Sequence, residues 1–382
     1  MRNTVIGIVI GVVVGVVVGA TLIAPRLIPE GGGVTVLGKA NPDGITETTA
    51  ALPLAASITG RMALRWTMVS AYGPNRPQFG DVAKRIDSEI WRVSGGATEI
   101  KLQDAAELEL DSGLIDAVAS GTLAAALLGP DELGAKSPAL ELVSAMPFGP
   151  PARAHLAWLR FGGGLKAATT VMQKLHIKGL PCGLIGSEGG GWFRDRLRTP
   201  EDLQDLRIRL TGFGGRVIEK LGAKALATAP DQVFADLESR DLDAVIHSVP
   251  SNDAALDFHK FARFYYLPGW QRPVTVVYLV INLDKWRALS ATRKAQIEAV
   301  CGRNIELSLA ESEHAQFEAL KLLTKNGVNL DRWPSGIVRD LREAWQNTTA
   351  EIAAVDPDFK KTWQSVVDFR KEFSIWEELG LL

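Results

Sequence analysis

The sequence predicts an α/β protein of two lobes joined by a hinge, and three observations indicate this. With 382 residues, 46% of them hydrophobic, the chain can bury a substantial core and is long enough for two lobes. Predicted strands and helices alternate from residue 61 to residue 121, which is typical of a mainly parallel sheet flanked by helices. Val274–Asn282 is a strongly β-branched and aromatic run. We expect it to form a buried strand that leads back into the first lobe, and strands that cross between lobes create a hinge.

Residues 1–25 are predicted to be a membrane anchor or a signal peptide. Val5–Ala24 is a stretch of twenty residues without a charge, which is about the length that a helix needs to cross the hydrocarbon core of a membrane. Arg2 precedes the stretch and favours a cytoplasmic N-terminus, with the rest of the chain outside. A cleaved signal peptide is the alternative, with Val18-Gly19-Ala20 as its cleavage site. We expect a retained helix, followed over residues 26–59 by a flexible tether rich in Gly, Pro, Thr and Ala.

Residues 60–183 are predicted to form the first part of lobe I. Alternating apolar and polar residues indicate strands, and apolar residues at helical spacing indicate helices. The expected elements are the strand Arg61–Ala71, the helix Gln78–Val93, the strand Thr98–Leu102, the helix Asp111–Gly121, the interrupted helix Ala154–Gln173 and the strand His176–Leu184.

Residues 184–264 are predicted to form lobe II, and residues 265–382 to complete lobe I. The expected elements of lobe II are the strand Arg207–Leu210, the helices Arg216–Leu221 and Ala229–Ser239, and the strand Leu242–His247. After the crossing strand, Ser290 can cap a helix that runs from Ala291 to about Lys325. The remainder contains Trp345, Trp363 and Trp376 and is interpreted as a C-terminal helical layer.

Charge and cysteine content exclude several classes of function. The 42 basic and 44 acidic residues are nearly balanced, and nucleic-acid binding needs a clustered basic excess. A small organic ligand suits this balance better. The two cysteines, Cys182 and Cys301, are too few for a disulfide framework or a thiolate zinc site. We expect both to be buried as small apolar residues, and a single disulfide between them is the alternative.

The stretch Gly179–Gly222 has the layout of a binding site. Arg207–Leu210 alternates as a strand with one buried face, and a glycine-rich turn around Phe213 follows it before a helix begins at Arg216. Backbone N–H groups at the start of that helix and the guanidinium of Arg209 could therefore converge on one anionic ligand. No catalytic group is visible in this stretch.

Six stretches of the chain carry the pattern of a known family. They are Trp66-Thr67-Met68-Val69-Ser70, Met146-Pro147-Phe148-Gly149, Ala157-Trp158 with Phe161-Gly162-Gly163-Gly164, Gly190-Gly191-Trp192-Phe193-Arg194, Gly212-Phe213-Gly214-Gly215-Arg216-Val217 and Tyr265-Tyr266-Leu267-Pro268-Gly269-Trp270. Over residues 61–373 the sequence thus resembles the extracytoplasmic solute-binding proteins of TRAP transporters. The resemblance is to the branch that captures 2-oxo acids and other small organic monocarboxylates.

This resemblance implies a two-lobed, periplasmic-binding-protein-like (Venus flytrap) fold with a long helix across both lobes. It implies a periplasmic receptor that closes on a small organic carboxylate and delivers it to the membrane subunits of a TRAP permease. Some members of the family dimerise through a late helix, so a homodimer is a further implication. The alternatives are a ligand sensor that signals to a membrane partner and an enzyme. The chain has no His-Glu-x-x-His, Gly-x-Ser-x-Gly or Walker sequence, which argues against an enzyme.

Arg209 is the residue predicted to hold the carboxylate of the ligand. An inward-facing arginine beside a glycine-rich turn can bind a carboxylate with two parallel hydrogen bonds. A buried structural salt bridge is the alternative, but the ligand-clamping arginine of the resembled family falls at this position. The other predicted ligand-binding residues that match the family pattern are aromatic and would line the pocket, with packing in the core of a lobe as the alternative for Trp192, Phe193 and Trp270. They are Tyr72, Trp192, Phe193, Phe213 and Trp270.

Three positions depart from the 2-oxo acid pattern and are also assigned to the site. Glu188 replaces a glutamine, Ile246-His247 replaces Glu-Trp, and Arg272 replaces an acidic residue. The last two changes remove carboxylate oxygens that could coordinate a cation, while the first adds one. We therefore expect no metal and no cofactor. Arg272 and His247 would instead supply positive charge to the ligand, and Glu188 would partly offset it.

Overall fold

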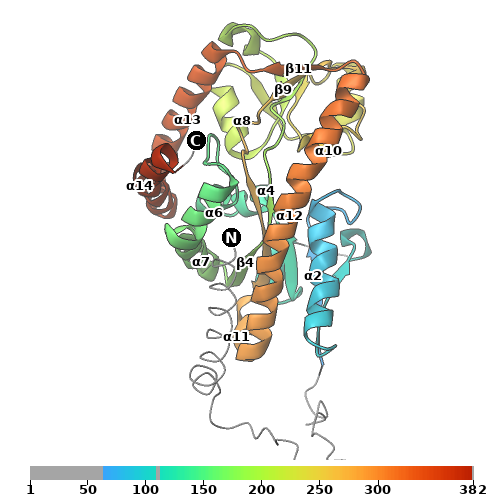
Figure 1. The fold of residues 1–382 in the computed structure, drawn as a ribbon, viewed down its shortest axis with the longest axis vertical. Coiled ribbons are helices and arrows are strands. Elements are labelled where there is room, and N and C mark those ends of the chain that lie inside the picture. The colour runs from blue at the N-terminus through green and yellow to red at the C-terminus, as the bar shows by residue number, and fades with distance from the viewer. Residues whose placement is uncertain (1–62, 109–111, 381–382) are drawn as a thin grey trace, which may run out of the picture. The chain divides into compact units, whose positions relative to one another are not determined.

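The computed structural model describes residues 63–108 and 112–380, which form two β-sheets covered by helices (Figure 1). The predicted anchor or signal and the predicted tether both lie outside these residues. Within the described part of the chain, no helix has the length and apolar character needed to span a membrane.

The first sheet has five strands in the order β2-β1-β3-β10-β4. Their bounds are Leu64–Ser70 (β1), Thr98–Gln103 (β2), Ala125–Leu128 (β3), Ile177–Ile185 (β4) and Thr275–Asn282 (β10). β1 pairs in parallel with β2 and β3, whereas β10 is antiparallel to both β3 and β4. All eight residues of β10 are buried. The β-branched run thus forms the expected buried strand of this mainly parallel sheet.

The second sheet has six short strands in the order β11-β9-β5-β8-β6-β7. Their bounds are Gly191–Phe193 (β5), Arg207–Arg209 (β6), Lys224–Leu226 (β7), Ala244–Val245 (β8), Phe264–Leu267 (β9) and Asn329–Arg332 (β11). β11 lies in the segment that the sequence analysis assigned to lobe I, and it pairs in parallel with β9. Sequence position did not reveal this pairing because more than sixty residues separate the two strands.

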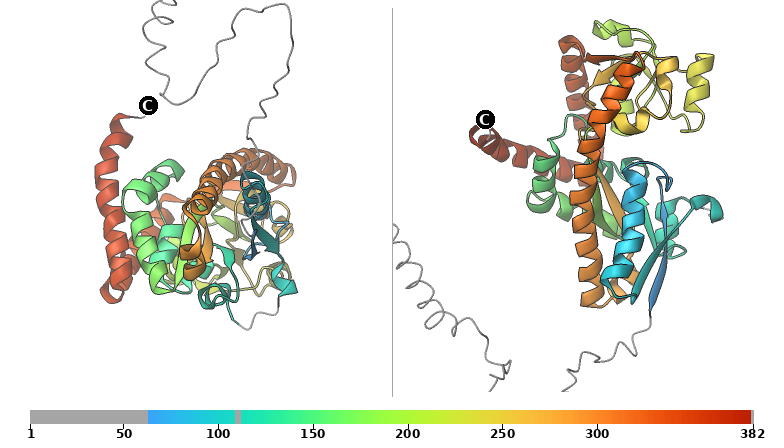
Figure 2. Two further views of the ribbon diagram at one scale, coloured as in Figure 1. Left: turned by 90° about the horizontal axis from the view of Figure 1, so that it is seen from below. Right: turned by 45° about the vertical axis from the view of Figure 1, so that its right-hand side comes forward.

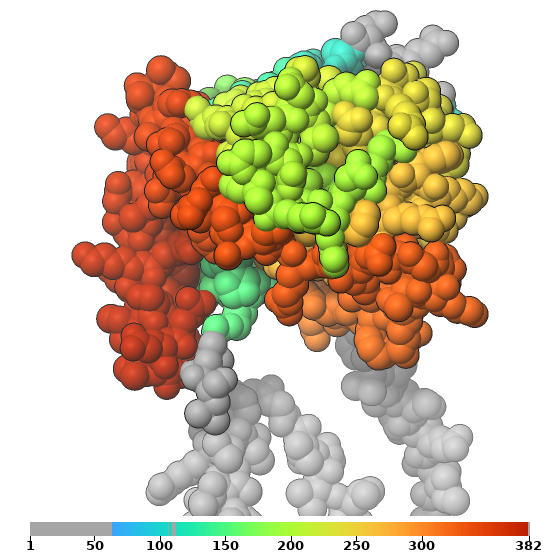
Figure 3. All heavy atoms as spheres, turned by 90° about the horizontal axis from the view of Figure 1, so that it is seen from above, coloured from blue at the N-terminus to red at the C-terminus, as the bar shows by residue number. Residues whose placement is uncertain are grey.

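Helices flank both sheets. Those before β4 are α2 (Phe79–Val93), α3 (Leu114–Ser120), α4 (Pro130–Gly134), α5 (Pro138–Ser144), α6 (Ala152–Phe161) and α7 (Gly164–Lys174). Those after β6 are α8 (Gly212–Glu219), α9 (Val233–Ser239), α10 (Pro250–Asp253), α11 (Leu283–Ala288), α12 (Ala291–Lys325), α13 (Ser335–Val355) and α14 (Pro357–Leu379). Figure 3 looks onto the part built on the second sheet, with α13 and α14 in orange-red to red along one flank.

Helix α12 runs alongside both sheets. It begins at the expected residue because the Ser290 hydroxyl accepts a hydrogen bond from the backbone N–H of Arg293, and it continues for 35 residues. Its first half packs on β4 and α2, and its second half reaches α10 beside the second sheet (Figures 1 and 2). A single helix therefore contacts elements from both parts of the molecule.

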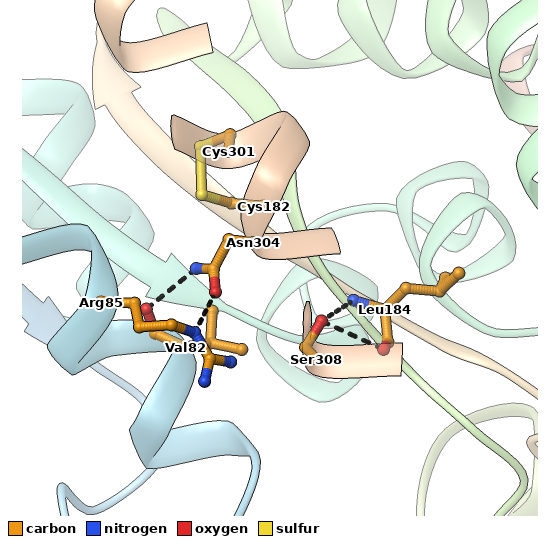
Figure 4. Close-up of a disulfide and its surroundings, with 7 residues drawn as sticks. All are labelled: Val82, Arg85, Cys182, Leu184, Cys301, Asn304 and Ser308. Atoms are coloured by element: carbon orange, nitrogen blue, oxygen red, sulfur yellow. Dashed lines mark hydrogen bonds between the residues drawn. A yellow bond between two sulfur atoms is a disulfide. The ribbon is translucent and has the colours of Figure 1, made fainter. Parts of the chain in front are cut away.

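A disulfide joins α12 to β4, which corrects the expectation of two unpaired cysteines. Cys182 and Cys301 are both buried, as expected, but they are bonded to each other (Figure 4). Two turns of α12 further on, the Ser308 hydroxyl bonds both the N–H and the carbonyl oxygen of Leu184, at 2.9 and 3.2 Å. Asn304 donates to the carbonyl oxygen of Val82 on α2 at 3.0 Å. This disulfide and these bonds fix α12 against the first sheet.

We predict that breaking the Cys182–Cys301 bond lowers the free energy of unfolding by roughly 2–5 kcal/mol, because the bond closes a long loop in the unfolded chain. The two cysteines are 119 residues apart in sequence. Urea denaturation of the full-length protein, with and without a reductant, measures the change. A Cys182→Ala/Cys301→Ala variant is the control and should not respond to the reductant. Equal unfolding midpoints for the oxidised and reduced natural protein would show that the bond contributes nothing.

Candidate ligand-binding site

Polar and charged side chains from both sheets meet at the carboxyl ends of parallel strands. Tyr72 follows β1, Asp131 lies in the first turn of α4 just after β3, Arg209 ends β6, and His247 follows β8. The carboxyl ends of parallel strands are where open α/β sheets bind ligands. The two segments that cross between the sheets, residues 186–190 and 268–274, add Glu188 and Arg272. We call this group of residues the cleft cluster.

Arg272 is the centre of the cleft cluster. Its Nη2 lies 2.5 Å from Oδ1 of Asp131, and its Nη1 lies 3.2 Å from Oδ2 of the same carboxylate. The distance from Nη1 to Oε1 of Glu188 is 3.6 Å. Burial disfavours the charge of Arg272, but the two carboxylates more than offset this and raise its pKa. Burial likewise favours the neutral form of Asp131, yet Arg272 and Thr211 lower the pKa of that carboxyl to about 2. Arg272 and Asp131 are therefore both charged at neutral pH.

Glu188 is buried on the other side of Arg272. Only 6% of its side chain is exposed. The side-chain amide of Gln271 donates to Glu188 Oε2 at 3.1 Å and to the carbonyl oxygen of Gly189 at 2.8 Å. Burial raises the pKa of Glu188, although Arg272 opposes the shift. Glu188 thus faces the guanidinium, and the amide holds it in place.

Arg209 is held by the backbone and forms no salt bridge among the described residues. Its Nη1 donates to the carbonyl oxygen of Ile246 at 3.1 Å. Its Nε is buried and has no hydrogen-bond partner in the described part of the chain. Burial lowers the pKa of Arg209, and the positive charge of Arg272 adds to this effect. Arg209 therefore does not form the structural salt bridge that was the alternative. Its buried Nε–H group remains available to a hydrogen-bond acceptor such as a ligand carboxylate.

His247 does not supply the positive charge that the sequence analysis assigned to it. Burial and the neighbouring charges of Arg209 and Arg76 lower the pKa of the imidazole to about 3. The ring is therefore neutral at physiological pH. Its Nδ1 is buried without a hydrogen-bond partner among the described residues. His247 can thus donate or accept one hydrogen bond, but it does not attract an anion by charge.

Hydrogen bonds join the first-sheet part to the second-sheet part at this place, and one of them runs from the Ser251 hydroxyl to Oε1 of Gln78 at 3.2 Å. Thr211 donates to Asp131 at 2.8 Å, and Arg76 donates to the Ser248 hydroxyl at 3.0 Å. The backbone N–H of Phe213 donates to Glu141 at 2.6 Å. The structure therefore has the two parts in direct contact across the cluster.

The bond between Phe213 and Glu141 changes the expected role of the glycine-rich turn. Gly212 has a φ of +61°, and a Cβ at this position would lie 2.1 Å from Oε1 of Glu141, so only glycine fits. Burial raises the pKa of Glu141 to about 7, although the N–H of Phe213 opposes the shift. This N–H at the start of α8 thus binds a carboxylate of the protein and does not face a ligand as the sequence analysis expected.

The structure brings five of the nine predicted residues together, namely Tyr72, Glu188, Arg209, His247 and Arg272. The Tyr72 hydroxyl lies against the backbone of Gly129, where a Cβ would be 1.6 Å away. Burial raises the pKa of Tyr72. The charge of Asp131 adds to this shift, and the charge of Arg272 opposes it.

The other four predicted residues are aromatic and have contacts that packing explains. Trp192 stacks on Tyr265 and donates to Asp253. Phe193 packs against Tyr266 and Trp333. Phe213 packs against Trp345 and Phe359. Trp270 stacks on Phe148 with ring centres 5.8 Å apart. The first three are almost completely buried in the core, which was the alternative considered for Trp192 and Phe193.

Sequence reasoning missed Arg76, Asp131 and Glu141. Arg76 lies in the loop directly after β1, and its guanidinium is 5.4 Å from the ring centre of Tyr72. Asp131 lies in the first turn of α4, which follows β3 after one glycine. A charged residue in the loop after a predicted strand was the available signal for Arg76. The strand before Asp131, β3, was not predicted from the sequence. Nothing in the sequence distinguished Glu141, which lies within a short helix.

Comparison with known proteins identifies the family. The sequence profile described as bacterial extracellular solute-binding protein, family 7, matches residues 68–356. A protein of Nostoc sp. named a monocarboxylate 2-oxoacid-binding periplasmic protein is 28% identical over 324 residues, which cover 84% of this chain and 87% of that protein.

Solved structures of TRAP solute-binding proteins have the same fold. One from Colwellia psychrerythraea, with bound calcium and pyruvate, matches with a TM-score of 0.79 and 28% identity, covering 83% of this chain and 97% of that chain. One from Bordetella bronchiseptica, a dimer with calcium and picolinate bound, also has a TM-score of 0.79 and 28% identity, covering 83% and 94%. One from Pseudoalteromonas atlantica, with sodium and pyruvate, has a TM-score of 0.77 and 28% identity, covering 82% and 96%.

The profile covers most of the described residues, and these relatives agree with it in both sequence and fold. The chain belongs to family 7 of the bacterial extracellular solute-binding proteins, the periplasmic receptors of TRAP transporters.

Proposed function

We propose that this receptor captures a small organic monocarboxylate, and specifically a 2-oxo acid, between its two lobes and delivers it to a TRAP permease. The observation that carries the proposal is the buried Nε of Arg209, which has no partner among the described residues. A ligand carboxylate would accept hydrogen bonds from this N–H and from a terminal nitrogen of the same guanidinium. Two relatives that are 28% identical have pyruvate bound, and a third is named for 2-oxo acids, which supports this ligand class.

The contacts across the cleft cluster support closure around the ligand. Asp131 of α4 accepts hydrogen bonds from both Arg272 and Thr211. Arg76 reaches Ser248 from the opposite side. These bonds are short and polar and can break and reform as the two parts separate, with the crossing segments acting as the hinge. Closure excludes water from the ligand and strengthens its hydrogen bonds to Arg209.

We further propose that the ligand binds without a bridging cation. Three relatives hold calcium or sodium together with a carboxylate ligand. In this chain the carboxylates of Asp131 and Glu188 face the guanidinium of Arg272, at 2.5 and 3.6 Å. A cation needs several oxygen ligands that are not already neutralised by a positive charge. The described residues contain no group of three or more acidic, His or Cys side chains arranged to hold a metal ion. The donor set around Arg272 therefore does not fit a cation.

The first prediction for this site concerns Arg209. A thermal-shift screen of 2-oxo acids and other small monocarboxylates on the full-length protein identifies a binder, because ligand binding raises the unfolding midpoint. Arg209→Ala should then weaken that binder by about 2–5 kcal/mol, since its carboxylate would be buried and unpaired. Arg209→Lys should also bind poorly, because an ammonium group cannot form the two parallel bonds. Calorimetric titration measures both changes.

The control for Arg209 is Arg198→Ala, which removes the same charge from an exposed residue of the second-sheet part. It should bind the ligand as the natural protein does. The proposal is wrong if Arg209→Ala retains an affinity within about threefold of the natural protein, a difference of well under 1.4 kcal/mol.

The second prediction concerns metal ions. Removal of divalent ions with a chelator, and replacement of sodium by an organic cation, should leave the affinity for the binder nearly unchanged. Arg272→Glu, which restores an acidic residue, should instead bind only when calcium or sodium is added back. Calorimetry in matched buffers tests both statements. One outcome is that the natural protein binds no ligand after the ions are removed and that Arg209→Ala binds none in their presence. This outcome would support the role of Arg209 in binding the carboxylate and would reject binding without a metal ion.

A further inference from the structure

A pocket lies beside the crossing segments, between them and α13 and α14. Its volume is about 440 Å³, which falls in the range of roughly 300–1,000 Å³ for small-molecule sites. Ser187 and Pro273 line it, whereas their neighbours Glu188 and Arg272 do not and belong to the cleft cluster. Adjacent residues of an extended segment point in opposite directions. The pocket thus includes crossing-segment residues other than those of the cleft cluster. We call it the back pocket.

The back pocket is lined by three arginines that have no acidic partner. Arg332 ends β11, Arg342 lies on α13 and Arg370 lies on α14. Among the described residues, none of the three forms a salt bridge with a carboxylate. Arg342 lies over the ring of Phe148 at 4.4 Å, and Arg370 donates to the carbonyl oxygen of that residue at 3.2 Å. Two guanidinium groups thus converge on one residue of the pocket wall.

The acidic residue of the lining does not neutralise these arginines. Glu377 lies 3.6 Å from Arg153, which is outside the lining. Burial lowers the pKa of Arg370, and the positive charge of Arg342 adds to this effect, whereas the negative charge of Glu377 opposes it only in part. Arg332, Arg342 and Arg370 are exposed residues. Like charges held near each other repel, and an anion placed between them reduces the repulsion. The charge pattern therefore favours an anionic ligand.

The remaining walls are aromatic and apolar. Trp270 comes from the crossing segment, Trp333 directly follows β11 of the second sheet, and Phe369 and Phe373 come from α14. A small inorganic anion would leave these surfaces in contact with water, whereas a flat apolar body would cover them. Guanidinium groups also stack on aromatic rings, as Arg342 already does on Phe148. The pocket thus combines a cationic side with walls suited to an aromatic ring.

We propose that the back pocket binds an aromatic monocarboxylate, as a site separate from the cleft. Arg342 and Arg370 would bind the carboxylate, and the tryptophan and phenylalanine side chains would enclose the ring. This site does not depend on the ligand proposed for the cleft, because Arg209 and the rest of the cleft cluster take no part in it.

The test is a calorimetric titration of the full-length protein with 1-naphthoate and with the neutral 1-naphthamide, which has a ring of the same size. We expect naphthoate to bind and naphthamide to bind at least about tenfold more weakly, because charge-assisted hydrogen bonds are roughly twice as strong as neutral ones. An Arg342→Gln/Arg370→Gln variant should lose at least about tenfold in affinity for naphthoate for the same reason.

Two control variants make the result specific. Arg339→Gln/Lys371→Gln removes the same charge from α13 and α14 at residues outside the lining, and it should bind naphthoate as the natural protein does. Arg209→Ala should also bind naphthoate normally. Thermal unfolding midpoints confirm that each variant is folded.

Three results would overturn the proposal. One is the absence of naphthoate binding at millimolar concentration. The second is an unchanged affinity in Arg342→Gln/Arg370→Gln. The third is loss of naphthoate binding in Arg209→Ala, which would assign that ligand to the cleft.

Discussion

The buried charge of Arg272 is the constraint around which the cleft is arranged. A guanidinium taken out of water must be paired, because removing one partner of a buried ion pair typically costs about 3–5 kcal/mol. Asp131 comes from a helix on the first sheet, Glu188 from one crossing segment and Arg272 from the other. The requirement for pairing therefore fixes three separate segments relative to one another. It also leaves Arg209, another cation at this place, without a salt bridge among the described residues and able to bind the acid of a ligand.

The fold places this charged group where both parts of the molecule can act on it. Parallel strands of both sheets end at the cluster, and α12 runs beside both sheets. The disulfide and the bonds from Ser308 and Asn304 hold α12 on the first sheet. Further along the helix, the side chain of Gln316 accepts a hydrogen bond from the backbone N–H of Ser251 on α10 at 2.9 Å. A periplasmic location agrees with a disulfide, because disulfides persist in oxidising compartments.

Local sequence patterns predicted the elements well and the contacts between them poorly. The helix from Ala291 to Lys325 and the strand at residues 274–282 follow from capping and from β-branched content, which act over a few residues. Arg209 was found because it lies on a short strand before a glycine-rich turn. The pairing of Cys182 with Cys301 and of Asp131 with Arg272 joins residues more than one hundred positions apart. The spacing of apolar residues along the sequence does not indicate contacts between residues so far apart. Trp192 could be assigned either to a pocket wall or to the core from its type alone, and only its packing on Tyr265 distinguishes the two.

The most direct test of the account is a crystal structure of the protein with a bound 2-oxo acid, grown without added metal ions. The account predicts the ligand carboxylate on the guanidinium of Arg209, with nitrogen-to-oxygen distances of about 2.7–2.9 Å. It also predicts that Arg272 stays paired with Asp131 and Glu188 and that no cation lies between ligand and protein. A carboxylate held by a metal ion, or bound away from Arg209, would contradict the account.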